Sequence, residues 1–157
     1  VGINGVIKSF DLVNYKMIAE INPKGNGSRV MSLDVKNDKI AWLKSKNSIG
    51  IMNLKGEELF SLESISEEQD DIRMLKFSPD GGMLCSSGFR VNLIGKVKSD
   101  ENSIKVWDIK RKNLLKELKG IVNGIMQFSF HPEKNHVAIY LRRTKNRTKT
   151  ESTYRKR

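Results

Sequence analysis

The chain has 157 residues, of which 38% are hydrophobic and 30% charged, and this length and composition are typical of one soluble globular domain. No apolar run approaches the roughly 20 residues that a membrane span needs, and no secretory leader opens the sequence. The single cysteine, Cys85, excludes an internal disulfide and a four-cysteine zinc site, so we expect an intracellular protein. The formal net charge of the chain at pH 7 is +11.

Alternating apolar and polar residues predict strands along the whole chain before the basic C-terminus. The first pair covers 5–11 and 16–21, two sets of four strands cover 29–62 and 72–118, and a last pair covers 125–130 and 136–141. Two similar turns, at 78–82 with Pro79 and two glycines and at 131–133 with Pro132, separate strands of the later sets. No 12-residue window has the apolar spacing of a helix, so the sequence predicts an all-β fold.

Three stretches of the sequence repeat the same order of apolar residues, at 5–21, 48–62 and 102–118. Their matching dipeptides are Phe10-Asp11, Met52-Asn53 and Trp107-Asp108, spaced 42 and 55 residues apart. A period of about 40–45 residues is that of a four-stranded propeller blade. The longer interval contains an insertion at 89–101.

These dipeptides, together with "FSPDGGMLCSSG", resemble the WD40-repeat family of β-propellers over about residues 2–140. The resemblance implies that Trp107, Phe10 and Met52 each end the third strand of a blade and pack between blades as a wedge. It also implies that Asp108, Asp11 and Asn53 accept backbone hydrogen bonds in the turn that follows. The Gly-His dipeptide of the family is missing from every repeat, and an unrelated antiparallel sandwich is the alternative fold.

The predicted strands make two whole blades and two half-blades within a partial propeller domain over 1–141. Propellers typically have four to eight blades, so the ring is incomplete. We expect other residues of a longer chain, or another chain, to supply the missing blades, and we favour a segment of a longer protein.

A narrower resemblance rests on "VGINGVIKSFDL", on the repeat that begins "NLLKELKG" and on the acidic stretch "LESISEEQDD". Together they look like the last blades of the retinoblastoma-binding-protein-five scaffold subunit of COMPASS-type histone lysine methyltransferase complexes. This implies a nuclear, non-catalytic scaffold that binds other protein subunits, assists a SET-domain methyltransferase and contacts the nucleosome. The final two strands and the acidic segment that follows the propeller in that group are absent here, so roles of those parts are not carried over.

Two long connections are predicted to lie on one face of the blades, where alternate loops of antiparallel strands meet. A solvated charged rim is the plain interpretation, and a docking surface for partner proteins is the functional one. The candidate residues are Glu63, Glu67, Glu68, Asp70 and Asp71 in the acidic connection, and Arg90, Leu93, Lys96 and Lys98 in the insertion.

The last sixteen residues, 142–157, hold eight Lys or Arg and one Glu, a net charge of +7 that leaves +4 for the other 141 residues. Without aliphatic side chains this segment cannot form a core and is predicted to be a disordered basic tail. The alternative function is therefore a nucleic-acid-associated WD-repeat protein, such as a ribosome-assembly factor, that binds through the tail. The candidate contacts are Arg142, Arg143, Lys145, Arg147, Lys149, Arg155, Lys156 and Arg157.

The sequence contains no recognisable catalytic constellation. His131 precedes a proline in a turn, His136 begins the next strand, and these two with Cys85 do not form a metal site or a Cys-His pair. We therefore expect no enzymatic activity, no cofactor, no metal and no small-molecule substrate.

Overall fold

The computed structural model describes residues 5–22, 33–45, 47–63, 69–91, 102–121, 125–134 and 136–141. Twelve strands form in this part of the chain: β1 (Ile7–Asp11), β2 (Lys16–Ile21), β3 (Leu33–Lys36), β4 (Lys39–Ser45), β5 (Ser48–Asn53), β6 (Glu58–Glu63), β7 (Gln69–Phe77), β8 (Met83–Val91), β9 (Asn102–Asp108), β10 (Asn113–Ile121), β11 (Ile125–Phe130) and β12 (Val137–Leu141).

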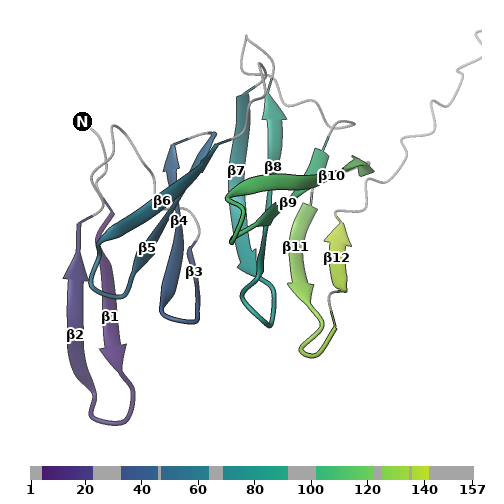
Figure 1. Cartoon of the computed structure of the whole chain (residues 1–157). Coiled ribbons are helices and arrows are strands. Elements are labelled where there is room, and N and C mark those ends of the chain that lie inside the picture. Colours follow the sequence, from purple (N-terminus) through teal and green to yellow (C-terminus); the bar gives the residue numbers. More distant parts are fainter. Residues whose placement is uncertain are drawn as a thin grey trace, which may run out of the picture.

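The strands form four separate antiparallel sheets that follow one another along the chain. β3 to β6 and β7 to β10 are complete four-stranded sheets in sequential order, and β1–β2 and β11–β12 are two-stranded. Figure 1 shows them side by side in chain order, from the purple β1–β2 hairpin to the yellow-green β11–β12 hairpin. The predicted all-β fold of two whole and two half propeller-like blades is therefore confirmed, and we call these sheets blades.

The second complete blade extends further than the sequence pattern predicts. It spans Gln69 to Ile121 instead of 72–118, because β7 and β8 continue to pair as far as Gln69 with Val91. Asp70 and Asp71 consequently lie in β7, and Arg90 lies opposite Asp70 in β8, so their placement in loops was wrong.

A large hydrophobic cluster joins the two complete blades. The indole of Trp107 is 1% exposed, and its Nε1 donates a hydrogen bond of 2.9 Å to Ser86 Oγ within the same blade. Side chains of both blades surround it: Ala41, Leu43, Ile49, Ile51 and Leu62 from the first, and Ile72, Leu75, Phe77, Leu84 and Ile109 from the second. Such face-to-face packing removes the apolar side chains of both sheets from water.

Smaller clusters join the half-blades to their neighbours. Ile7 and Ile21 pack against Ile40, Trp42 and Met52 of the first complete blade. On the other side, buried Cys85, Ile104, Ile125 and Phe128 form the cluster between the second blade and β11–β12, with Met74, Val106, Ile121, Phe130, Val137 and Ile139 packed against it.

Gly50 makes room for one of the two tryptophans. A Cβ at Gly50 would overlap the indole of Trp42, which lies opposite on the neighbouring strand β4. A strand glycine often marks such a close approach, and here it allows a large indole to lie flat against the sheet.

Polar contacts link the two complete blades near their first strands. The Asp34 carboxylate on β3 accepts a hydrogen bond of 2.7 Å from the Phe77 backbone N–H, and its other oxygen lies 3.5 Å from Lys76 Nζ. Asn37 Nδ2 donates to the Asp80 carbonyl at 2.9 Å. These contacts fix how the blades lie against each other, which apolar packing alone does not specify.

Replacing Trp107 with alanine is expected to lower the free energy of unfolding by about 3–5 kcal/mol, because the change leaves an aromatic-sized cavity between two blades. Urea denaturation followed by circular dichroism measures this loss. Val13→Ala, at a side chain that is 86% exposed, is the matched control and should change stability by no more than about 0.5 kcal/mol. A Trp107→Ala protein as stable as the parent would show that the cluster between the blades does not depend on this side chain.

Candidate functional site

The three residues predicted as inter-blade wedges lie in different surroundings. Trp107 and Met52 are 1% and 2% exposed, each between its own blade and the preceding sheet. Phe10 is 53% exposed, so its placement as a buried wedge was wrong for this structure. The physical reason is that, among the described residues, a sheet covers only the face of β1–β2 that carries Ile7 and Ile21.

The residue after each wedge position organises the turn that follows. Asp108 Oδ1 accepts a hydrogen bond of 2.8 Å from the Arg111 N–H, and Asp11 Oδ1 accepts bonds of 2.7 and 3.1 Å from the N–H groups of Val13 and Asn14. Asn53 Oδ1 accepts bonds from backbone N–H groups in the same way. These residues therefore support the local structure of their turns.

Hydrogen bonding lowers the pKa of the turn carboxylates. The pKa of Asp108 lies below its ordinary value mainly because its carboxylate accepts the Arg111 N–H, and the Arg111 guanidinium adds an ion pair at 3.0 Å. The pKa of Asp11 is lowered by the N–H groups of Val13 and Asn14. Both carboxylates are thus charged in the folded turn at neutral pH.

Cys85 and His131 lie in different surroundings, the cysteine buried and the histidine in an exposed turn. Burial raises the pKa of the Cys85 thiol to about 12, so the thiolate is scarce near neutral pH. His131 Nδ1 accepts a hydrogen bond of 3.2 Å from the Glu133 N–H in an exposed turn. Within the described ranges, no cluster of three or more His, Cys, Asp or Glu side chains could hold a metal ion, and no helix is long and apolar enough to cross a membrane.

Most of the predicted partner surface falls outside the described residues. Glu63 is exposed at the end of β6. Gln69 pairs with Val91, so the start of β7 lies beside the end of β8. Glu67, Glu68, Leu93, Lys96, Lys98 and the whole basic segment 142–157 lie outside the described residues.

The outer strand of the second blade carries a surface that the sequence pattern did not predict. β10 is an edge strand, and Leu114, Leu115 and Leu118 are 40%, 47% and 38% exposed. Lys116 and Lys119 are exposed on the same strand. We call these five residues the β10 rim. No sequence signal distinguished these leucines, because adjacent apolar residues can both be buried in a blade, as Ile40 to Leu43 are in β4.

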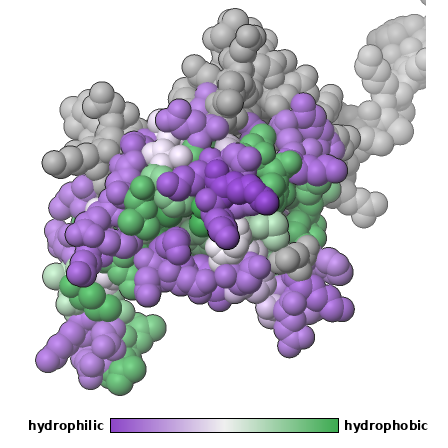
Figure 2. All heavy atoms as spheres, viewed as in Figure 1, coloured by the Kyte–Doolittle hydropathy of each residue, from purple (hydrophilic) through white to green (hydrophobic). Residues whose placement is uncertain are grey.

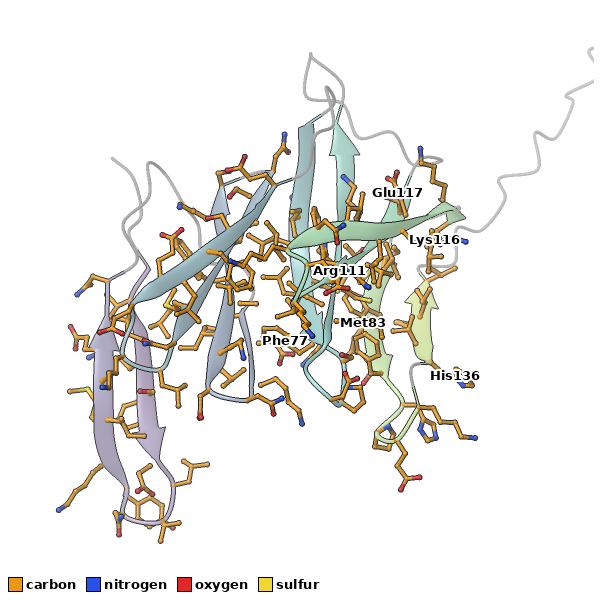
Figure 3. All side chains as sticks on the ribbon, viewed as in Figure 1. Phe77, Met83, Arg111, Lys116, Glu117 and His136 are labelled. Atoms are coloured by element: carbon orange, nitrogen blue, oxygen red, sulfur yellow. The ribbon has the colours of Figure 1, made fainter. Side chains whose placement is uncertain are left out.

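Charged groups beside the leucines make the β10 rim predominantly basic. Burial alone would raise the pKa of Glu117, but hydrogen bonds from Ser103 and Lys119 and the charge of Lys105 outweigh burial and lower it. Figure 3 shows Lys116 and Glu117 on β10, with Arg111 in the turn before it. Lys112, in the same turn, lies 5.0 Å from the Phe60 ring centroid on the first blade. Exposed leucines and lysines therefore lie together on the edge strand β10.

Comparison with known proteins supports the fold but gives no family. No family model and no curated protein matches the chain. Among solved structures, the hydrazine synthase of Kuenenia stuttgartiensis is similar with a TM-score of 0.64 and 17% identity, over 85% of this chain and 37% of that one. The dihydro-heme d1 dehydrogenase NirN, solved in complex with DHE, is similar with a TM-score of 0.51 and 18% identity, over 74% of this chain and 24% of that one.

This chain therefore covers about a quarter to two fifths of the length of the solved chains that it resembles. At these identities the likeness shows a shared all-β, multi-sheet architecture alone. It identifies neither a WD40-repeat family member nor a histone methyltransferase subunit.

Asp108→Asn should flatten the pH dependence of stability in acid. The pKa of Asp108 is lowered on folding. The ionised carboxylate therefore stabilises the fold fully above the pKa of the unfolded state, near 3.9, and this stabilisation is lost as the pH falls through the pKa of the folded state. The asparagine keeps an oxygen acceptor, as Asn53 does in the first blade, but cannot titrate. Urea unfolding at several pH values between about 5 and 2 should show a smaller loss of stability for the variant. An unchanged pH profile would contradict the stabilising role of the ionised carboxylate.

Proposed function

We propose that this chain is a non-catalytic, WD40-type interaction scaffold that binds protein subunits along the outer strands of its blades. The observation that carries the proposal is the β10 rim, where three leucines are exposed on an edge strand among lysines. Large apolar side chains exposed on an edge strand are candidates for contact with a partner. The buried Cys85 thiol and the turn position of His131 agree with a structural, non-enzymatic role for these residues.

The β10 rim is suited to side-chain docking instead of strand addition. The pairing of β10 with β9 shifts register between Leu114 and Lys116 and again between Leu118 and Ile121. Bulges and lysines are features that keep edge strands from pairing with another strand. The partner is therefore expected to place apolar side chains on the leucines and carboxylates near the lysines.

We further propose that the complex is a nuclear, COMPASS-type histone methyltransferase assembly. The support is the resemblance of "VGINGVIKSFDL", of the repeat that begins "NLLKELKG" and of the acidic stretch 62–71, of which Glu63 is exposed at the end of β6. In this complex the chain would hold a SET-domain subunit and contact the nucleosome without taking part in methyl transfer.

A double substitution in the β10 rim tests the scaffold role. Leu114→Asp/Leu118→Asp should weaken binding to a reconstituted SET-domain methyltransferase module at least about tenfold by isothermal titration calorimetry. Val35→Asp, at a side chain 50% exposed on β3, is the control and should leave the affinity unchanged. Equal affinities for parent and double variant would overturn the docking role of the rim, and no binding of the parent would overturn the COMPASS assignment.

The charge of the C-terminal segment favours a second candidate, a nucleic-acid-associated protein. Eight Lys or Arg among residues 142–157 could neutralise phosphates, and duplex affinity would then fall with salt with a log–log slope of about −0.9 per phosphate. Deleting 142–157 should abolish that salt-dependent binding while leaving the β10 rim competent. Duplex affinity that is unchanged by the deletion would rule this candidate out.

A further inference from the structure

The two half-blades correspond to complementary halves of one complete blade. In β7–β8, Phe77 lies opposite Leu84, and in β11–β12, Phe130 lies opposite Val137. The same backbone hydrogen bond, from the residue after the phenylalanine to the carbonyl five residues later, closes both turns. The β11–β12 hairpin therefore has the first two strands of a blade.

The β1–β2 hairpin has the last two strands. Asp11 lies opposite Lys16 as Asp108 lies opposite Asn113, and each aspartate accepts the backbone N–H of the third residue after it. Likewise, Lys8 on β1 pairs in register with Glu20 on β2, as Lys105 does with Glu117 in the complete blade. The two half-blades together thus contain the four strands of one blade, each once.

Side chains that are buried in the complete blade are exposed at the matching positions of the β1–β2 hairpin. Phe10 is 53% exposed where Trp107 is 1% exposed, and Leu12 is 79% exposed where Ile109 is 7% exposed. In Figure 2, apolar surface gathers on the hairpin that protrudes at the lower left, which is β1–β2 in Figure 1. In the complete blade, the strand pair β7–β8 and the preceding blade cover these positions.

A matching exposed strand lies at the other end of the array. β12 has a partner only on its β11 side among the described residues, and Tyr140 is 68% exposed where the equivalent Ser87 of β8 is 2% exposed. β8 is covered there because it pairs with β9. Unpaired strand edges carry backbone N–H and C=O groups that readily accept another strand.

We propose that a second copy of this chain completes the blade, with β1 of one copy pairing antiparallel with β12 of the other. The pairing of β8 with β9 gives the register, since Leu84 lies opposite Trp107 and Ser87 opposite Ile104. The equivalent pairs between copies are Phe10 with Val137, Ser9 with Ala138, Lys8 with Ile139, and Ile7 with Tyr140.

This register places Phe10 of the second copy on a partly buried apolar surface. Val137 and Ile139 already pack toward the cluster of Cys85 and Ile104, and Phe10 would join it as Trp107 joins the cluster between the complete blades. Two such contacts would join the described sheets of two copies into a twofold ring of six blades, within the four to eight that propellers have. The pairing would cover the free edges of β1 and β12. It does not involve the β10 rim, so the rim would stay free for another partner.

Sedimentation equilibrium of the 157-residue chain tests the proposal directly. A mass of twice 17.9 kDa is expected at about 10–100 µM protein. Phe10→Asp should shift the mass to the monomer, whereas Val13→Asp on the same hairpin should leave it unchanged, since Val13 corresponds to the exposed Lys110. A monomeric parent over this range, or a dimer that Phe10→Asp leaves intact, would overturn the proposal.

Disulfide trapping tests the register. In a Cys85→Ser background, mixing the Phe10→Cys chain with the Val137→Cys chain should give an oxidised, reductant-sensitive pair of chains. Phe10→Cys mixed with Ala138→Cys is the offset control and should cross-link at least tenfold less, because neighbouring strand residues point to opposite faces. Equal trapping in both mixtures would contradict this register, and a disulfide formed within one chain of the Phe10→Cys/Val137→Cys double variant would contradict pairing between copies.

Discussion

Packing between neighbouring sheets is the constraint on which the rest of this structure depends. A four-stranded antiparallel sheet has two faces, and each complete blade here has buried apolar side chains on both. One isolated sheet cannot remove both sets from water, so each blade needs a neighbour on either side. Trp107 and Trp42 are the largest fully buried side chains and lie in two successive interfaces, and Gly50 gives the indole of Trp42 its space.

The same constraint explains where the molecule exposes apolar surface. Phe10, Leu12 and Tyr140 belong to half-blades whose outer faces or edges have no neighbour among the described residues. Leu114 and Leu118 are exposed for a different reason, because β10 is the outermost strand of a complete blade. The first group therefore suits completion of the ring, and the second suits a separate partner on its rim.

The repeat pattern made the blades predictable, whereas the exposure of individual residues was not. Period-two alternation and the recurring dipeptides located the two half-blades and the two complete blades to within a few residues of their bounds, because a strand with one buried face must alternate. The same pattern predicted Phe10 as a buried wedge, since a repeat alignment cannot tell which copies have a neighbouring sheet. Asp70 was placed in a loop because acidic residues are unusual in strands, although pairing with β8 extends β7 past it.

Unfolding of single-tryptophan variants tests most directly whether the blades stabilise one another. Trp42 reports on the interface with β1–β2 and Trp107 on the interface between the complete blades, so Trp107→Phe and Trp42→Phe each leave one probe. In each variant, the urea transition seen by tryptophan fluorescence should coincide with the one seen by far-ultraviolet circular dichroism. Separate midpoints, with one interface lost while the sheets persist, would contradict the account.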